Sequence, residues 1–396
     1  MEKKEKAPVL RFKDTNGKDY PAWEQRKLED CATIIMGQSP KSENYTNDPK
    51  DHILVQGNAD LKNGQVAPRV WTTEVTKIGK VGDIILSVRA PVGEVGKTAY
   101  DVVLGRGVAA IRGNDFLLQT LLKLKECKYW GKVSAGSTFD SITSEILKST
   151  LISMPAIEEQ IKIGDFLSSV DKLITLHQRK LEALKKLKRT LLQKMFPKKG
   201  HLKPELRFFG FTNDWEQRKL NEIASIYDGT HQTPRSTSNG IPFLSVENIT
   251  TLQSSKFISE KDFLRDFPVY PKKGDVLLTR IGDVGTANVY ERNQKVAFYV
   301  SLALLKLRET DPYFVNASFR SNSTRKEVWK RTLHIAFPKK INKNEIGKVN
   351  IQIPSLAEQR KIGIFFYSLD RLITLHQRKL EIYKKLKKGL LQKMFI

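Results

Sequence analysis

The sequence predicts an α+β fold in which two globular α/β bodies are separated by two long antiparallel coiled-coil helices, with an internal pseudo-twofold repeat. Three observations predict it: a long repeated segment, helical spacing of apolar residues inside that segment, and short β-type runs outside it. The decapeptide Leu-Ile-Thr-Leu-His-Gln-Arg-Lys-Leu-Glu occupies 173–182 and again 372–381. The match extends over 156–196 and 355–395, where about two-thirds of the positions are identical. Such a repeat reveals the architecture before any local motif does.

Each copy of the repeated segment predicts one long helix. The first copy has no proline, and no glycine after Gly164. Its apolar residues recur at intervals of three and four, at Ile163, Phe166, Val170, Leu173, Leu181, Leu184, Leu187, Leu191 and Met195. This stripe is typical of a helix that packs on another helix. About 40 residues at 1.5 Å each make a helix of roughly 60 Å. We expect the two similar helices to pair with each other.

The charge balance favours a polyanionic partner. The 396 residues include 68 Lys and Arg against 43 Asp and Glu, which gives a net charge of +25. Because no apolar membrane anchor accompanies this excess, nucleic acid is the expected partner. Lysine-rich helices that are merely solvated would account for part of the charge.

Other classes are disfavoured by the remaining composition. The two cysteines, Cys31 and Cys127, form no CxxC pair, so neither a disulfide framework nor a zinc site is expected. Residues 1–6 contain no apolar leader, and no apolar run approaches membrane-spanning length. We therefore expect a cytoplasmic protein without a membrane partner.

The repeat also includes a leading segment before each body. The sequences at 8–12 and 23–28 return at 204–208 and 215–220, and 198–201 links the two halves. The predicted domains are a first globular domain at 1–155, a long helix at 156–196, a second globular domain at 197–354 and a long helix at 355–396.

Each body predicts short strands followed by a helix. Turn signals such as Gly82-Asp83 and Gly274-Asp275 separate the runs. The predicted strands are 53–55, 83–88, 92–100 and 102–111 in the first body, and 242–246, 276–280 and 296–307 in the second. The predicted helices are 115–129 and 312–329. Both bodies end in a proline followed by a Glu-Gln pair, a combination suited to a helix start.

The two bodies, 29–155 and 221–354, resemble each other far less than the two long helices do. They share only a skeleton such as Gly-Asp-Ile-Ile-Leu at 82–86 and Gly-Asp-Val-Leu-Leu at 274–278. A symmetric scaffold with two different bodies suits a protein whose bodies recognise different things. Simple divergence of the bodies is the alternative.

The sequence offers no catalytic constellation and no metal site. It lacks the Asn/Asp-Pro-Pro-aromatic tetrapeptide of amino-methyltransferases. Gly-Glu-Val-Gly-Lys-Thr at 93–98 ends like a Walker A loop, but its first glycine is replaced by Pro91, which removes a backbone N–H that a phosphate cradle would use. His177 and His376 lie inside the long helices, where a register-setting role is expected rather than metal ligation.

Several motifs resemble the specificity subunit of a bacterial type I restriction-modification enzyme. They are the Pro-x-x-x-Glu-Gln runs at 155–160 and 354–359 and the Gly-Asp strands at 82–93 and 274–285. The resemblance covers essentially the whole chain. It implies two target-recognition domains that bind double-stranded DNA, held apart by the long helices.

The resemblance also implies partners. It implies two modification subunits that use S-adenosylmethionine to methylate adenine, and motor-nuclease restriction subunits that use ATP and Mg²⁺. This chain would then be non-catalytic and would carry no cofactor itself.

Base reading needs side chains with paired donors or acceptors, chiefly Arg, Lys, Asn and Gln. The candidates in the first body are Gln56, Asn58, Arg69, Arg89 and Arg106. Those in the second body are Thr230, His231, Gln232, Arg235, Glu247, Asn248 and Arg280. All are expected in or beside turns at strand ends. A phosphate contact or an ordinary turn role is the alternative for each.

One offset separates the two sets of candidates. Arg89 stands one place later after its Gly-Asp strand than Arg280 does. Because successive residues of a strand point to opposite faces, the two arginines need not do the same job.

Two other functions remain open at this point. One is a self-contained methyltransferase or nuclease, which the missing motifs disfavour. The other is a coiled-coil protein that bridges DNA without sequence choice, which the two dissimilar bodies disfavour.

Overall fold

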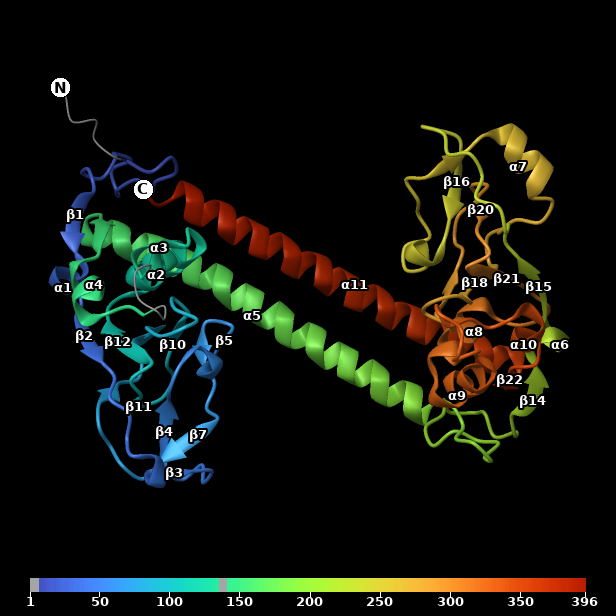
Figure 1. The fold of residues 1–396 in the computed structure, drawn as a ribbon, viewed down its shortest axis with the longest axis horizontal. Helices are drawn as coiled ribbons and strands as arrows, with labels where there is room; N and C mark the ends of the chain where they lie inside the picture. The colour runs from blue at the N-terminus through green and yellow to red at the C-terminus, as the bar shows by residue number, and fades with distance from the viewer. Residues whose placement is uncertain (1–6, 135–140) are drawn as a thin grey trace. The chain divides into compact units, whose positions relative to one another are not determined.

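The computed structural model describes residues 7–134 and 141–396. Residues 1–6, for which no apolar leader is expected, lie outside the described residues. The chain divides into two compact units. The first unit comprises 1–179 and 377–396, and the second comprises 180–376. Each unit contains one body and part of each long helix (Figure 1).

Both predicted long helices are present, and they are antiparallel in each unit. Helix α5 spans Ile157–Lys194 and helix α11 spans Leu356–Lys393, 38 residues each. In the first unit Lys387 Nζ donates to both carboxylate oxygens of Asp171, at 2.6 and 2.8 Å. In the second unit the equivalent pair forms with the helices exchanged, because Lys188 of α5 pairs with Asp370 of α11. Within each unit the ribbons of α5 and α11 accordingly lie side by side (Figure 1).

The apolar stripe of α5 is narrower than predicted. Ile163, Val170, Leu181 and Met195 are buried, as expected. Phe166, Leu173 and Leu187 are exposed by 40% or more of their surface, so their assignment to the buried seam is wrong. A helix that meets one partner helix covers only a narrow stripe, and these three side chains lie beside it.

Each body begins and ends in one antiparallel strand pair. In the first unit β1 (Glu24–Lys27) pairs with β13 (Leu151–Met154). In the second unit β14 (Glu216–Lys219) pairs with β22 (Asn350–Ile353). The chain therefore enters and leaves each body at adjacent positions, directly beside the start of a long helix.

The first body contains two sheets. The six-stranded sheet has the order β2-β12-β9-β10-β6-β5, and the five-stranded sheet has the order β3-β7-β4-β11-β8. Their strands are β2 (Thr33–Met36), β3 (Tyr45–Thr46), β4 (His52–Val55), β5 (Leu61–Lys62), β6 (Gln65–Val66), β7 (Val70–Thr72), β8 (Ile78–Gly79), β9 (Ile84–Ser87), β10 (Val95–Lys97), β11 (Val102–Leu104) and β12 (Val108–Arg112).

The second body has smaller sheets of related layout. One has the order β15-β21-β18-β19 and the other β17-β16-β20. Their strands are β15 (Ala224–Asp228), β16 (Ile241–Leu244), β17 (Phe257–Ile258), β18 (Val276–Thr279), β19 (Ala287–Val289), β20 (Ala297–Phe298) and β21 (Leu302–Leu307). In both bodies a parallel pair, β4 with β11 or β16 with β20, lies in the second sheet.

Short helices complete both bodies. Those of the first unit are α1 (Leu28–Cys31), η1 (Ser42–Asn44), η2 (Asn58–Asp60), α2 (Asp115–Glu126), α3 (Tyr129–Val133) and α4 (Ser144–Ser149). Those of the second are α6 (Leu220–Ile223), η3 (Val246–Asn248), α7 (Glu260–Asp266), α8 (Pro312–Arg320), α9 (Asn322–Arg331) and α10 (Lys343–Gly347).

Three predicted elements differ from the structure. The expected strand at 102–111 is two strands, because Gly105–Gly107 turns against the preceding chain; a Cβ on Gly107 would lie 2.1 Å from the carbonyl oxygen of Gln56. The expected strand at 296–307 is likewise broken by a turn at 299–301. The expected strand at 92–100 is reduced to β10, which follows a turn at Gly93 with φ +86°.

The two expected body helices also end early. Helix α2 stops at Glu126, before Lys128 takes a left-handed conformation with φ 54°. The expected helix at 312–329 is two helices, because Ser321 has extended backbone angles and its hydroxyl accepts from the N–H of Thr324, which starts α9.

The same aromatic cluster anchors each body to the long helices. In the first unit Phe116 of α2 stacks on Phe395, and both meet Trp23 edge-on. In the second unit Phe314 of α8, Phe196 and Trp215 repeat this arrangement. Phe196 and Phe395 end the repeated Leu-Leu-Gln-Lys-Met-Phe motif, so each copy of that motif completes the core of a unit. Among the described residues, no helix is long and apolar enough to cross a membrane.

Candidate nucleic-acid interface

The repeated Glu-Gln motif joins the leading segment to the long helix. Glu159 is fully buried and accepts two hydrogen bonds from the Arg11 guanidinium, at 3.0 and 2.7 Å, and one from Trp23 Nε1 at 3.2 Å. Arg207 and Glu358 form the same bidentate pair at 2.7 Å. The hydrogen bond to the carboxylate is the chief cause that raises the pKa of each arginine. These motif residues are structural, and they fix where each body sits on its helices.

In the first body, Asp60 gathers three of the candidate residues. It is 2% exposed and accepts from the backbone N–H of Gln56 at 2.7 Å and from Arg69 Nε at 2.8 Å. Asn58 lies on the same 3₁₀ turn, η2. The Arg69 side chain remains 46% exposed beyond this contact.

The Gly105–Gly107 turn brings the other two candidates to the same end of the sheets. Gly105 donates to the carbonyl of Val55, directly before Gln56, at 2.8 Å. Val88 donates to the carbonyl of Gly107 at 2.9 Å, so Arg89 adjoins the turn that carries Arg106. Both arginines are exposed, and the backbone N–H of Arg106 is held by Ser39 Oγ at 3.1 Å. Gln56, Arg89 and Arg106 therefore adjoin one turn, and Asp60 connects η2 and Arg69 to Gln56.

The second body has an equivalent turn at 299–301. Val300 donates to the carbonyl of Thr230 at 2.9 Å, and Val246 of η3 donates to Ser301 Oγ at 3.1 Å. The N–H of Arg280 donates to the carbonyl of Ser301 at 2.9 Å. The Thr230 loop, η3 and the end of β18 thus converge here as their counterparts do in the first body.

The second-body candidates differ in how free their side chains are. His231, Gln232 and Arg235 are exposed on the loop after β15. Glu247 pairs with Lys256 Nζ at 2.8 Å, and this hydrogen bond lowers the pKa of its carboxyl. Asn248 uses both sides of its amide locally, because Oδ1 accepts from Ser245 N–H at 2.9 Å and Nδ2 donates to the Gln253 carbonyl at 2.8 Å.

Arg280 lies in different surroundings from Arg89, as the one-residue offset predicts. Its side chain is 8% exposed, forms an ion pair with Asp228 and donates from Nε to the carbonyl of Ile341 at 3.2 Å. The residue at the equivalent place in the first body is the buried Val88, since Ile142 N–H meets the Val88 carbonyl as Ile341 N–H meets that of Arg280.

Asp60, Ser39 and Asp228 are site residues that sequence reasoning missed. Acidic and hydroxyl side chains are not expected to read guanine. The sequence therefore did not indicate that these residues bind neighbouring arginines and backbone N–H groups. The available signal was the position of Asp60 three residues after Gly57, at the end of η2, where its carboxylate accepts from the Gly57 N–H at 3.2 Å.

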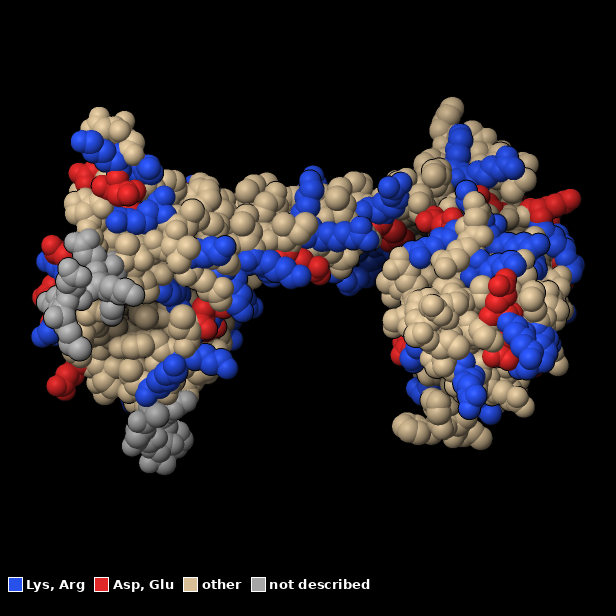
Figure 2. Space-filling view, turned by 90° about the horizontal axis from the view of Figure 1, so that it is seen from above, with Lys and Arg blue, Asp and Glu red and all other residues tan. Residues whose placement is uncertain are grey.

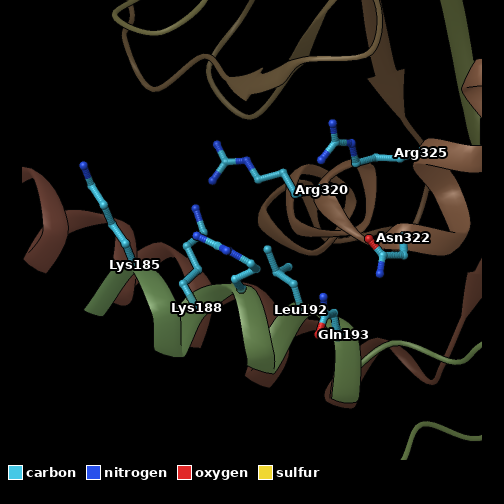
Figure 3. Close-up of a pocket in the computed structure, with 8 residues that line it drawn as sticks. Lys185, Lys188, Leu192, Gln193, Arg320, Asn322 and Arg325 are labelled. Carbon is cyan, nitrogen blue, oxygen red and sulfur yellow. The ribbon is translucent and has the colours of Figure 1, made fainter. Parts of the chain in front are cut away.

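A basic pocket of about 250 Å³ was also missed, in the second unit. Cationic side chains from α5 and from α8 and α9 converge on it (Figure 3). Its lining residues are Lys185, Lys188, Arg189, Leu192, Gln193, Arg320, Asn322 and Arg325. Both Lys188 and Arg320 pair with Asp370, and among the described residues no carboxylate pairs with Lys185, Arg189 or Arg325. Burial first, and then Arg320, lowers the pKa of Lys188.

Basic side chains also lie elsewhere on the surface. On the face shown in Figure 2, lysine and arginine side chains gather along the long helices and over the second body. Within the described residues no group of three His, Cys, Asp or Glu side chains is arranged to hold a metal ion. The arrangement suits the binding of a polyanion by charge, with exposed hydrogen-bonding side chains at two turns.

A family model described as "Type I restriction modification DNA specificity domain" matches residues 21–186 and 212–384. The chain belongs to this family. The two matched segments cover both bodies and most of both long helices, so the family and the α+β fold expected from the motifs are confirmed.

Curated relatives agree with this assignment, and a solved structure shares the fold. The type I restriction enzyme MjaVIII specificity subunit of Methanocaldococcus jannaschii is 24% identical over 410 residues, covering 96% of this chain and 94% of that one. The candidate MjaX specificity subunit of the same organism is 33% identical over 190 residues, covering 46% of this chain and 44% of that one. The crystal structure of the type I restriction-modification S subunit from M. genitalium shares the fold, with a TM-score of 0.70, 16% identity and 99% of both chains covered.

Proposed function

We propose that this chain selects the DNA sequence on which a type I restriction-modification complex acts, and that each body reads one half of a bipartite, asymmetric site. The supporting observation is the pair of equivalent turns, 105–107 and 299–301. Their hydrogen-bonded surroundings match, but the side chains around them do not. Because different side chains at the same place present different donors and acceptors, the two half-sites differ.

The chain itself supplies sequence choice and assembly in this proposal. Methylation of adenine with S-adenosylmethionine belongs to two modification subunits, and cleavage with ATP and Mg²⁺ belongs to the restriction subunits. Since DNA is the partner, the proposal places the protein in the cytoplasm.

The long helices offer a surface for the modification subunits. Leucines at equivalent positions of α5 and α11 are between 40% and 60% exposed, namely Leu173, Leu176 and Leu187 with Leu372, Leu375 and Leu386. The same residues recur in both helices, so two copies of one partner can bind through the same contacts. This repetition of exposed apolar side chains supports a protein interface over a solvated face.

The length of the helices sets the spacer between the half-sites in this proposal. Adding about one heptad to both helices in register lengthens them by roughly 10 Å, or about three base pairs of 3.4 Å. Methylated sites should then keep both half-sites and gain spacer. An active insertion variant with unchanged spacing would contradict the role in spacing.

Mapping of methylated adenines tests the proposal directly. A cell that expresses this chain with its modification subunits should methylate one bipartite, non-palindromic sequence, and deletion of the chain should abolish that methylation. Methylation without sequence preference, or of a continuous palindrome, would contradict it.

The net charge of +25 alone would also suit a protein that bridges DNA without sequence choice. Binding of the assembled complex to target and scrambled duplexes separates the two functions. Equal affinity for both duplexes at physiological salt would favour bridging.

A further inference from the structure

A loop at residues 332–340 adjoins the candidate interface of the second body. Its two ends are tied together by the Leu333 N–H, which donates to the Lys340 carbonyl at 2.8 Å. Gly282 donates to the Lys339 carbonyl at 2.8 Å, and Ile341 donates to the Arg280 carbonyl at 2.9 Å. The loop is therefore fixed to the end of β18, beside the turn at 299–301.

Two large apolar side chains project from this loop into solvent. Ile335 is 99% exposed and Phe337 is 104% exposed, whereas Thr332 at the base of the loop is buried. Isolated apolar side chains are common on protein surfaces, but two fully exposed ones on a loop with fixed ends indicate a binding role.

The base of the loop is held by an aromatic contact. His334 packs on Trp329 with ring centroids 4.1 Å apart, and its Nε2 lies 2.9 Å from the Trp329 carbonyl oxygen. The Lys339 ammonium lies 4.9 Å from the Trp329 ring centroid on a face of the same indole. These contacts order the residues on both sides of Ile335 and Phe337, so little further ordering is needed on binding.

Cations lie close to the two apolar side chains along the chain. Lys339 and Lys340 follow Phe337 after one proline, and Arg325 and Lys326 lie about two turns before the loop on α9. The nearby Glu327 is neutralised by Lys330 and Arg331. An apolar tip with a positive border complements stacked bases with phosphates on either side, whereas a purely apolar partner protein would leave this charge unpaired.

We propose that Ile335 and Phe337 insert between stacked bases of the DNA bound by the second body and unstack that base step. The inference rests on the proposed function, because it requires DNA at this body. Insertion of apolar side chains between base steps is an established way to bend a duplex, and its energy depends on the step that is opened. The loop therefore adds selection by deformability to selection by hydrogen bonds at one half-site.

The test uses the assembled complex of this chain with its modification subunits. The probe is a duplex with the target sequence that methylation mapping identifies. It carries 2-aminopurine at successive positions in and beside the half-site of the second body. The variant is Phe337→Ala. Its matched control is Phe209→Ala, because Phe209 is equally exposed, at 100%, in the same unit but far from the loop in sequence.

Apart from the methylated adenine, which a methyltransferase flips out of the stack, the wild-type complex and the Phe209→Ala control should raise 2-aminopurine fluorescence at one step. Phe337→Ala should lose that rise and bind about tenfold more weakly, which corresponds to the loss of one base–aromatic stack. The salt dependence of its affinity should be unchanged, because no phosphate contact is removed. Phe337→Leu should keep the fluorescence rise.

Two results would overturn the inference while the proposed function stands. One is target binding by the wild-type complex without a fluorescence rise at any position other than the methylated adenine. The other is normal DNA binding by Phe337→Ala together with loss of modification subunits on co-purification, which would assign the loop to a protein contact. If the wild-type complex does not prefer its target, the proposed function itself fails.

Discussion

The two bodies share a hydrogen-bond framework but place different chemistry at one equivalent position. In the first body Val88 packs in the core with Met36. In the second body the corresponding residues are Arg280 and Asp228, which form an ion pair with the arginine 8% and the aspartate 25% exposed. Strand registers establish the equivalence, because Met36 opposes Ala109 as Asp228 opposes Ala303.

The scaffold around the bodies shows the opposite behaviour. Gln160 Nε2 donates to the Pro155 carbonyl at 2.9 Å, and Gln359 Nε2 donates to the Pro354 carbonyl at 2.8 Å. The buried Arg–Glu pair is likewise repeated in both units. These contacts that position a body are therefore repeated in the two units, whereas contacts inside a body differ. Positioning and recognition are thus carried by different residues.

The largest expected effect comes from exchanging one body. Replacement of 29–150 by the corresponding segment of another specificity subunit should change one half of the methylated sequence and leave the other half and the spacing intact. These limits keep β1 and β13 in the scaffold, since Leu28 N–H donates to the Thr150 carbonyl at 2.9 Å at the edge of that pair. Methylome mapping of the hybrid gives the result.

The reciprocal exchange is the control. Replacement of 221–349 should change the other half-site, because Leu220 N–H meets the Val349 carbonyl at 3.0 Å in the same way. The incoming segment must supply an aromatic residue equivalent to Phe116 or Phe314 to complete the anchoring cluster. Changes spread over both half-sites would show that the bodies do not read DNA independently.

The second prediction compares the two buried carboxylates of the scaffold. Glu159→Ala and Glu358→Ala should each reduce the free energy of unfolding by about 3 kcal/mol, because each removes the carboxylate partner of an arginine that is only 12% or 14% exposed. Glu159→Ala should cost about 1 kcal/mol more, since it also removes the acceptor of Trp23 Nε1. Trp215 Nε1 has no acceptor among the described residues.

Urea denaturation followed by circular dichroism measures both variants. Glu159→Gln is the conservative control, because it keeps the side-chain shape and one acceptor oxygen. Losses below 1 kcal/mol in both alanine variants would show that the paired motif does not hold the bodies in place.

The long helices could be predicted from the sequence almost to the residue, because their apolar period and internal repeat are local properties. The breaks at Gly105–Gly107 and at Ser321 could not. The first depends on the Gln56 carbonyl, which approaches from another strand, and the second depends on a serine whose hydroxyl caps the following helix. Local patterns do not reveal which distant backbone will meet a turn.

The position of the candidate site could be predicted from the sequence. The burial and the protein partners of its side chains could be predicted less well. Arg106 and Arg89 were expected at strand ends and lie exposed there. The burial of Arg280 follows from Asp228, 52 residues away, and the ordering of Arg69 follows from Asp60. Whether any of these residues contacts a base stays a prediction, because protein partners such as Asp60 and Asp228 do not identify which DNA group a side chain would contact.

The third prediction transfers the apolar pair of the first body to the second. Arg280→Val alone should cost about 3 kcal/mol of stability, because Asp228 loses its partner while three-quarters of its surface stays covered. The double variant Arg280→Val with Asp228→Met should recover most of that loss. Thermal unfolding of the three proteins measures it.

The same double variant tests the role of Arg280 in recognition. If the arginine only holds Asp228, the methylated sequence stays unchanged in the double variant. Loss of one base preference within the second half-site would instead show that Arg280 reads DNA. A double variant as unstable as Arg280→Val would show that the two bodies are not interchangeable at this position.

The smallest expected effect concerns the basic pocket. This prediction compares equivalent positions on the two long helices. Arg189 in α5 lines the pocket with Arg320 and Arg325, whereas Lys388, its equivalent in α11, lies in the first unit. If the pocket holds a DNA phosphate, Arg189→Ala should weaken binding for target and scrambled duplexes alike. It should also reduce the slope of log affinity against log salt by about one.

Lys388→Ala is the matched control for this variant and should change the slope less, because no arginines from α8 and α9 converge there. Fluorescence anisotropy over a salt series with a labelled duplex measures both slopes. Equal changes in the two variants would mean that the long helices contribute diffuse charge only. No change with Arg189→Ala would exclude a phosphate from the pocket. A carboxylate of the modification subunit would then be the expected partner of these cations.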